Sequence, residues 1–301
     1  MKKIVVLGSL NMDMVLTTDR LPVIGETIHG EYIHYMMGGK GANQAVAASR
    51  LGISTSLIGC VGNDTFGEKI LKHLSEEKLD VSSVRKEDNI FTGIATVFKT
   101  NRDNAIVVIP GANDCCDRRV VDENIDKIKQ ADVLLTQLEV PMETVKYALK
   151  KAKEFGVQTI LNPAPYKDLP TELLEYVDFL TPNETEFESM VGSKFENSEE
   201  LEKEMLQWSK RNQLNLIVTR GSRGSSYIED GKVLTLPCIK VDVVDTTGAG
   251  DTFNGILAYA MAEKMELREA VTMAGIGASL SITALGAQTG MPSIQKLKQY
   301  L

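Results

Sequence analysis

The stretch that decides the fold of this chain is Asp245-Thr246-Thr247-Gly248-Ala249-Gly250-Asp251-Thr252-Phe253-Asn254-Gly255. Small residues precede Asp251, and an apolar run of helical character begins at Ile256. A small-residue turn that opens a helix leaves backbone N–H groups free, and these groups and the helix dipole favour an anion. Because Asp251 lies in the same turn, the stretch predicts phosphoryl transfer, in which Asp251 deprotonates an attacking hydroxyl. The alternative is a helix N-cap without chemistry.

Short apolar runs alternate with segments of helical period along the rest of the chain, which is typical of a parallel sheet covered by helices. The predicted strands are Lys3–Ser9, Ser54–Val61, Val133–Leu138, Gln158–Leu161, Phe179–Thr181 and Leu216–Thr219. The predicted helices are Ala42–Leu51, Phe66–Glu77, Arg118–Gln130, Met142–Phe155, Glu184–Val191, Glu199–Arg211, Thr252–Glu263, Leu267–Ala284 and Ile294–Tyr300. The pattern therefore predicts an α/β fold, a Rossmann-like three-layer sandwich with a central, mostly parallel sheet.

Two segments break this rhythm, because residues 14–37 and 92–109 alternate like strands without a helix between them. A turn around Asn101-Arg102-Asp103-Asn104 would join the strands of the second segment as a hairpin. We expect one domain over residues 1–301, with a small discontinuous β-sheet lid formed by these two segments. An edge extension of the main sheet is the alternative.

Composition narrows the classes of partner. The 301 residues carry a formal net charge of −8, which disfavours a nucleic-acid backbone as partner. No apolar stretch is long enough to span a membrane. The four cysteines show no metal-ligand spacing and include the neighbours Cys115 and Cys116, so we expect a cytoplasmic protein without a disulfide framework.

Polar residues fall where predicted strands end, which is where open α/β sheets bind their ligands. Asn11 and Asp13 follow the first strand, Glu139 follows the third, and the Asn183–Glu186 stretch and the Thr219–Gly224 loop follow two later strands. The glycine run Gly38–Gly41, which includes Lys40 and precedes Asn43, permits close backbone approach to a ligand but lacks the Walker spacing. Taken singly, Asp13 is typical of a turn and Asn183 of a helix start.

These motifs together resemble the ribokinase-like carbohydrate kinase family. Its two signatures are present as GGKGANQAVAASRLG over Gly38–Gly52 and DTTGAGDTFNG over Asp245–Gly255. NPAP (Asn162–Pro165), TPNETE (Thr181–Glu186) and TRGSRG (Thr219–Gly224) stand between them in the family's order. The resemblance runs from Lys3 to Pro292 and implies ATP-dependent phosphorylation of D-ribose at O5, with Mg²⁺ and an activating K⁺.

The resemblance also implies roles for individual residues. Asp251 would be the base, with an anion hole from Gly248, Ala249 and Gly250. The sugar would be bound by Asn11, Asp13, Gly39, Lys40, Gly41, Asn43, Glu139 and Asp251. ATP would be held by Asn183, Thr219, Arg220, Gly221, Ser222, Arg223, Gly224, Gly250, Asp251 and Gly275, with Glu186 helping to place Mg²⁺. The K⁺ site would comprise Asp245, Thr247, Ser281, Ala284, Gly286 and Gly290.

One departure from the family concerns Gly290, where a serine ligand is common in its members. The resemblance further implies a homodimer that pairs through the lids. Three alternatives stay open: a kinase for fructose, deoxyribose or a keto-deoxy acid, a sugar-binding regulator without catalysis, and a dehydrogenase. The dehydrogenase is disfavoured because Gly8-Ser9-Leu10 lacks the G-x-G-x-x-G pattern.

Overall fold

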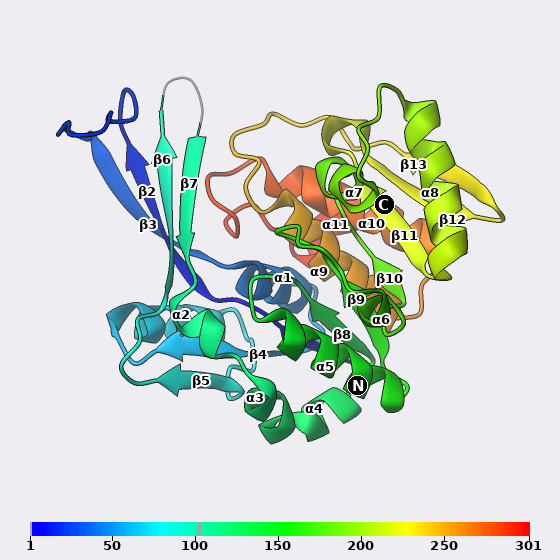
Figure 1. Cartoon of the computed structure of the whole chain (residues 1–301), viewed down its shortest axis with the longest axis horizontal. Coiled ribbons are helices and arrows are strands. Elements are labelled where there is room, and N and C mark those ends of the chain that lie inside the picture. The colour runs from blue at the N-terminus through cyan, green and yellow to red at the C-terminus, as the bar shows by residue number, and fades with distance from the viewer. Residues whose placement is uncertain (1, 101–103) are drawn as a thin grey trace.

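The computed structural model describes residues 2–100 and 104–301, and its centre is a nine-stranded sheet (Figure 1). The strands lie in the order β13-β12-β11-β10-β9-β8-β1-β4-β5. All neighbours pair in parallel except β11–β12 and β12–β13, which are antiparallel. Their bounds are β1 Lys3–Leu7, β4 Ser54–Gly62, β5 Val84–Glu87, β8 Val133–Thr136, β9 Gln158–Leu161, β10 Phe179–Leu180, β11 Asn215–Thr219, β12 Ser225–Glu229 and β13 Lys232–Leu236. The mostly parallel sheet predicted from the sequence is confirmed.

Alternation of side chains along β1 sends apolar groups to both faces of the sheet. Ile4 and Val6 join one buried cluster, and Val5 and Leu7 join the other. The first cluster is covered by α1 (Lys40–Ser49), α2 (Thr65–Glu76), α9 (Ala249–Ala262), α10 (Leu267–Ser281) and α11 (Ile294–Leu297). The second is covered by α3 (Arg118–Glu123), α4 (Ile125–Lys129), α5 (Met142–Glu154), α6 (Thr171–Leu174), α7 (Glu184–Val191) and α8 (Ser198–Asn212). These layers form the expected three-layer sandwich.

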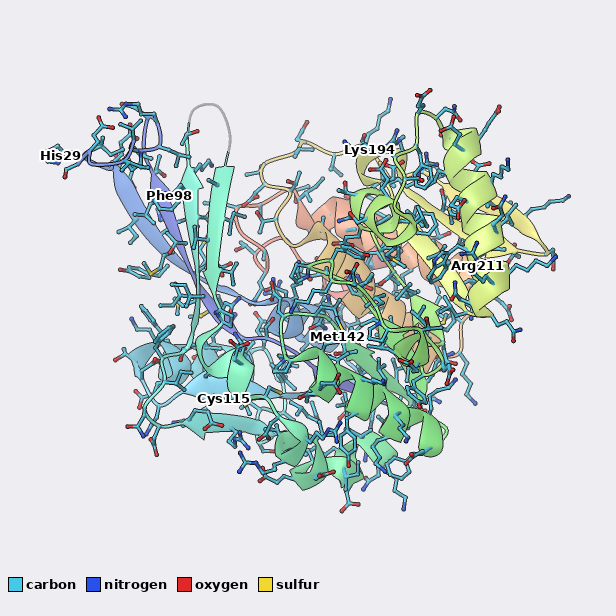
Figure 2. All side chains as sticks on the ribbon, in the orientation of Figure 1. His29, Phe98, Cys115, Met142, Lys194 and Arg211 are labelled. Carbon is cyan, nitrogen blue, oxygen red and sulfur yellow. The ribbon has the colours of Figure 1, made fainter. Side chains whose placement is uncertain are left out.

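A second, four-stranded sheet stands apart from the first, so the strand-like segments do not extend the edge of the main sheet (Figure 1). Its order is β3-β2-β6-β7, with bounds β2 Asn11–Thr17, β3 Tyr32–Gly38, β6 Gly93–Lys99 and β7 Asn104–Ile109. Figure 2 shows Phe98 on this sheet, across the molecule from Arg211 on α8. The predicted turn at 101–104 falls largely on residues 101–103, which lie outside the described residues.

The structure differs from the sequence-based boundaries in several places. The predicted helix Arg118–Gln130 is two helices, because Asn124 ends α3 and its side-chain amide donates to the carbonyl oxygen of Val120. The helix α9 begins at Ala249, earlier than predicted, and α10 ends at Ser281, also earlier than predicted. The strand β5 and the short helix α6 were not predicted. Among the described residues, no helix has the length and apolar character needed to cross a membrane.

Candidate active site

The first turn of α9 presents free backbone amides at the carboxyl edge of the sheet. Gly248 is the N-cap, with a φ of 78° that favours glycine. The Ala249 N–H donates to the Thr246 carbonyl at 3.3 Å, and the first regular helical bond runs from Thr252 N–H to Gly248 O at 2.8 Å. The N–H groups of Gly250 and Asp251 therefore have no backbone acceptor among the described residues, and they can bind an anion.

The carboxylate of Asp251 is held by two neighbouring amides of α1. Asn43 Nδ2 donates to Asp251 Oδ2 at 2.9 Å, and Gln44 Nε2 donates to Asp251 Oδ1 at 3.0 Å. The two helices can approach this closely because Gly255 of α9 has no side chain: a Cβ there would lie 2.4 Å from the Gln44 carbonyl oxygen. Asp251 is 7% exposed. Its position is thus fixed on the helix that carries the free amides.

Charged side chains gather beside Asp251. The carboxylates of Asp251, Glu139, Glu186 and Asp13 all raise the pKa of the Lys40 ammonium, with Asp251 contributing most. Burial and the nearby Glu139 and Asp251 charges raise the pKa of Asp13 to about 7. Asp13 Oδ1 is buried with no hydrogen-bond partner among the described residues. A buried, unpaired acceptor of this kind is suited to a ligand hydroxyl.

The residues predicted for the sugar lie where the small sheet meets α1. Gly38 leaves room for the Asp13 carboxylate, because a Cβ at residue 38 would lie 2.2 Å from Asp13 Oδ2. Gly39 has a φ of 89°, and Gly41 packs against the backbone of residues 8 and 9. Glu139 Oε2 accepts from the Lys40 backbone N–H at 3.0 Å and from Ser9 Oγ.

Asn11 is turned toward Asn113 of the 3₁₀ turn Gly111–Cys115, which was not among the predicted site residues. Asn113 Nδ2 donates to Asn11 Oδ1 at 2.8 Å, and Asn113 Oδ1 accepts from the Leu10 N–H at 2.9 Å. These bonds fasten the start of β2 at the base of the small sheet.

A cavity of about 190 Å³ joins the α9 turn to the residues predicted for ATP. It is lined by Lys40, Asn162, Ala164, Thr181, Asn183, Glu186, Thr219, Thr246, Gly248, Ala249, Gly250, Asp251 and Asn254. Asn183 and Glu186 form a reciprocal capping box at the start of α7, with Glu186 N–H to Asn183 Oδ1 at 2.7 Å and Asn183 N–H to Glu186 Oε2 at 2.8 Å. Burial raises the pKa of Glu186.

Other residues predicted for ATP do not line this cavity. A 3₁₀ turn that follows Thr219 contains Gly221 and Ser222, and Gly224 ends this turn. Arg220 is buried, and its guanidinium contacts Ser198 Oγ at 2.9 Å and Glu184 at 3.4 Å. The exposed Arg223 also pairs with Glu184, so both arginines are engaged within the protein. At Gly275 a Cβ would meet nothing within 4 Å, which leaves open space on α10.

The residues predicted for K⁺ lie around one loop after α10. Asp245 Oδ1 accepts from Thr247 Oγ1 at 2.7 Å, and Asp245 Oδ2 accepts from the Gly286 N–H at 2.8 Å. Burial raises the pKa of Asp245, but these hydrogen bonds outweigh it and the net shift is downward. The Ser281 carbonyl packs on Gly290, where a Cβ would lie 2.0 Å away, and Ala284 lies in the connection between them. This backbone therefore requires glycine at residue 290.

Four site residues that sequence reasoning missed are Gln44, Gln137, Gln288 and Asn113. All are buried, at 6% exposure or less. Gln137 Nε2 donates to Gln44 Oε1 at 2.7 Å, which orients the amide that holds Asp251. The available signal was a polar side chain beside an apolar stretch, as at Gln44, which directly precedes the run AVAA within α1. A polar residue in such a stretch is expected to be buried and hydrogen-bonded, but the sequence does not identify its hydrogen-bond partner.

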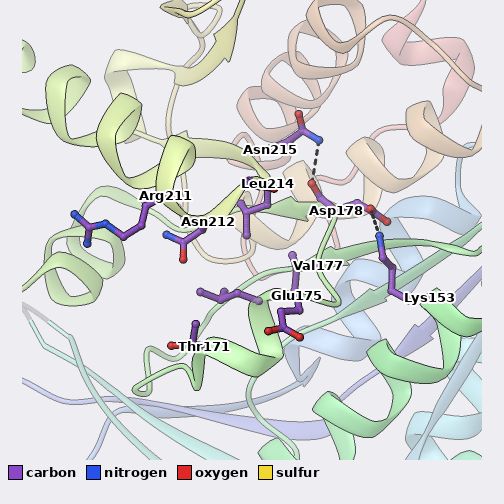
Figure 3. A pocket seen from close by; sticks show the side chains of 11 residues that line it. Lys153, Thr171, Glu175, Val177, Asp178, Arg211, Asn212, Leu214 and Asn215 are labelled. Carbon is purple, nitrogen blue, oxygen red and sulfur yellow. Dashed lines mark hydrogen bonds and ion pairs between the residues drawn. The ribbon is translucent and has the colours of Figure 1, made fainter.

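A larger cavity, about 480 Å³, lies at the amino-terminal ends of β10 and β11 (Figure 3). Lys153, Asp178 and Asn215 line it, and the Lys153 ammonium pairs with Asp178 Oδ1 at 2.5 Å. None of the predicted site residues is among its lining residues.

Known proteins share the sequence and the fold of this chain over almost its whole length. The model of the pfkB family of carbohydrate kinases matches residues 1–294. The chain is 39% identical to the ribokinase of Lactococcus lactis subsp. lactis, over 100% of this chain and 97% of that protein. It is 32% identical to a deoxyribokinase of Salmonella typhi, over 99% of this chain and 98% of that protein.

Among solved structures, the ribokinase of Arabidopsis thaliana complexed with ribose and ATP is similar, with a TM-score of 0.93 and 32% identity. The match covers 99% of this chain and 98% of that one. The sequence match and the fold match therefore both extend over almost the full length of the chain. The chain belongs to the pfkB family of carbohydrate kinases and is a sugar kinase of the ribokinase type.

Proposed function

We propose that this enzyme transfers the γ-phosphoryl group of ATP to O5 of D-ribose and forms D-ribose 5-phosphate and ADP. One observation carries the proposal: the buried Asp251 carboxylate lies in the same helical turn as the free Gly250 and Asp251 amides. Relatives named ribokinases, and a neighbour solved with ribose and ATP, support this choice of substrates.

In the reaction, O5 attacks the γ-phosphorus, and the bond between that phosphorus and the oxygen bridging to the β-phosphate breaks. The O5 proton passes to the Asp251 carboxylate and then to solvent, and ADP keeps the electron pair of the broken bond. The Gly250 and Asp251 amides stabilise the charge on the transferred group, and the Lys40 ammonium adds positive charge at the cavity wall. Asn43 and Gln44 hold the base in line with the hydroxyl.

The sugar would lie between the two sheets. Asp13 Oδ1 accepts a sugar hydroxyl in place of the partner it lacks within the protein, and Glu139, Asn43 and Lys40 border the same space. The γ-phosphate of ATP would occupy the 190 Å³ cavity, with the Thr219–Gly224 loop and Gly275 beside the nucleotide.

Mg²⁺ fits Glu186, whose Oε2 caps α7 and whose other carboxylate oxygen is left for a hydrated ion. Among the described residues no group of three or more His, Cys, Asp or Glu is clustered to hold a metal, and a hydrated Mg²⁺ needs few protein ligands. When bound, Mg²⁺ neutralises phosphate charge. K⁺ fits the oxygen donors of the group Asp245, Thr247, Ser281, Ala284, Gly286 and Gly290, and it would stabilise the loop that leads into α9.

We propose that the small sheet is a lid and also the surface of a homodimer. Its strands β3 and β7 expose Tyr32, Ile33, Tyr35, Ile106, Val107, Val108 and Ile109. Exposed strands of this length and apolarity favour pairing with a second copy. We expect Ile106→Lys to convert a dimer into a monomer in light scattering, whereas Val23→Lys, outside the sheet, leaves the mass unchanged. A wild-type monomer contradicts the dimer.

The substrate is tested with a panel of sugars in an ADP-release assay, run with and without K⁺. We expect ribose to give the highest kcat/KM, and K⁺ to raise the rate. Deoxyribose is the second candidate, because a deoxyribokinase matches over almost the full chain. A higher kcat/KM for deoxyribose or fructose than for ribose would replace our assignment, and sugar binding without ADP release would point to a regulator.

A further inference from the structure

A continuous row of side-chain hydrogen bonds leads from α2 to the Asp251 carboxylate. His73 Nε2 lies 2.8 Å from Gln288 Oε1, and Gln288 Nε2 donates to Asn43 Oδ1 at 2.9 Å. Asn43 Nδ2 then donates to Asp251 Oδ2 at 2.9 Å. The row joins α2, the loop after α10, α1 and α9. Side chains from four separate segments are thus linked in series, and Asn43 is the member that contacts the carboxylate of the base.

The direction of this row is determined by its inner end. A carboxylate only accepts hydrogen bonds, so Asn43 must point its NH₂ group at Asp251 and its oxygen at Gln288. Gln288 must then donate through Nε2 to Asn43 and accept through Oε1, so His73 carries its proton on Nε2. Each amide has one orientation in which every bond is satisfied.

Gln288 is itself held rigidly. Its side chain is buried at 6% exposure, and its carbonyl oxygen accepts from the Arg50 guanidinium at 2.5 Å. Arg50 also binds the Met291 carbonyl at 3.0 Å and pairs with Glu77 at 2.6 Å. With its backbone and its amide both fixed, Gln288 can impose an orientation on Asn43.

We propose that Gln288 is a positioning residue for phosphoryl transfer: by donating to Asn43 Oδ1 it keeps the Asn43 NH₂ group on the Asp251 carboxylate. Without this donor the Asn43 amide can turn over, and its oxygen would then face Asp251 and repel the base from its place. The inference rests on the proposed role of Asp251 as base. Gln288 contacts neither substrate, and it acts through Asn43.

The principal test is Gln288→Glu, which keeps the shape of the side chain but replaces the donor with an acceptor. A carboxylate at residue 288 attracts the Asn43 NH₂ group and so turns the amide away from Asp251. Residues that orient metal ligands typically cost roughly 10- to 100-fold in activity when they are replaced. By analogy we expect kcat to fall by roughly 10- to 100-fold, with the KM for ATP unchanged. Gln288→Met, which has no amide, serves as a second variant if the glutamate disturbs folding. Gln299→Glu, at an exposed position, is the matched charge control and should keep the wild-type kcat.

A double-mutant cycle separates positioning from a general structural effect. In an Asn43→Ala background the Gln288→Glu change should alter kcat less than about twofold, because the side chain through which it acts is gone. An equal fold-loss in both backgrounds would mean that Gln288 does not act through Asn43, and a near-normal kcat of the single variant would equally overturn the proposal.

Two further measurements keep this inference separate from the proposed function. If wild-type enzyme phosphorylates ribose and Asp251→Asn does not, a failure of the cycle refutes only the role of Gln288. If Asp251→Asn retains activity, the assignment of Asp251 as the base is wrong, and the role proposed for Gln288 is refuted with it. Independently of activity, ¹⁵N NMR of the neutral His73 ring should show the Nε2–H tautomer, and an Nδ1–H tautomer with Nε2 as acceptor contradicts the direction of the row.

Discussion

The two cavities at opposite ends of the central sheet differ in size and, more importantly, in whether their polar groups have partners within the protein. The amino-end cavity is the larger, about 480 Å³ against 190 Å³. The Asp178 carboxylate in this cavity is satisfied within the protein, because it accepts from Lys153 at 2.5 Å (Figure 3) and from the Thr159 N–H at 2.8 Å. The carboxyl-end cavity has free helix amides, and the neighbouring Asp13 has a raised pKa and an unpartnered oxygen.

This difference indicates that a functional site is marked by buried polar groups that lack a hydrogen-bond or ion-pair partner within the protein. A charge that already has a partner contributes to stability, whereas a buried charge without one costs stability and needs a ligand. The carboxyl end of a parallel sheet collects such groups because helix N-termini and strand ends meet there.

The largest effect is expected for Asp251→Asn, which tests whether the carboxyl-end cavity is the active site. The amide cannot accept the sugar proton, so we expect kcat to fall at least about 100-fold, at the low end of general-base contributions. Turnover by ADP release and thermal unfolding are measured together. A variant that folds normally and keeps a near-normal kcat refutes Asp251 as the base.

A second prediction tests the comparison of the two cavities through the raised pKa of Asp13. Its pKa in the folded protein, about 7, lies above the usual value near 4 of an unfolded chain. The folded state therefore binds the proton more tightly, and Asp13 costs stability increasingly as the pH rises from about 4 to 7. We expect Asp13→Asn to raise the free energy of unfolding at pH 8 by a few kcal/mol, while sugar phosphorylation is lost.

The stability gain of Asp13→Asn should shrink toward zero near pH 4. Asp242→Asn, at an exposed carboxylate, is the control and should show no such dependence. A gain that is the same at pH 5 and pH 8 would contradict the raised pKa of Asp13.

The smallest effect on activity is expected at the amino-end cavity. Asp178→Ala removes the acceptor for Lys153 and for the Thr159 N–H, and we expect a loss of about 1–3 kcal/mol in the free energy of unfolding. Both kcat and KM should stay at wild-type values. Glu175→Ala, exposed on the same cavity, should change stability by less than about 0.5 kcal/mol. A loss of kcat in Asp178→Ala, at temperatures where it stays folded, would assign a function to the larger cavity.

Much of the fold could be predicted from local pattern. The strands near Lys3, Ser54 and Gln158 and the helix Met142–Glu154 have strong periodicity and unambiguous ends, so their predictions held within a few residues. The start of α9 was predicted three residues late, because Gly248 and Gly250 weaken the helical pattern that tertiary packing against α1 then enforces. Strand β5 has the sequence VRKE, with Val84 as its one apolar residue, so it lacks the apolar run by which the other short strands were predicted.

The candidate site divides in the same way. The residue types and spacing of the Asp245–Gly255 and Gly38–Asn43 motifs were enough to predict the chemistry that we propose, since a turn of small residues before a helix leaves amides free wherever it lies. Only the tertiary structure decided that Gln44 donates to Asp251, that Gln288 donates to Asn43 and that Arg220 forms an ion pair. A hydrogen bond between residues more than 200 positions apart leaves no periodic trace in a sequence, because it depends on two helices meeting at Gly255.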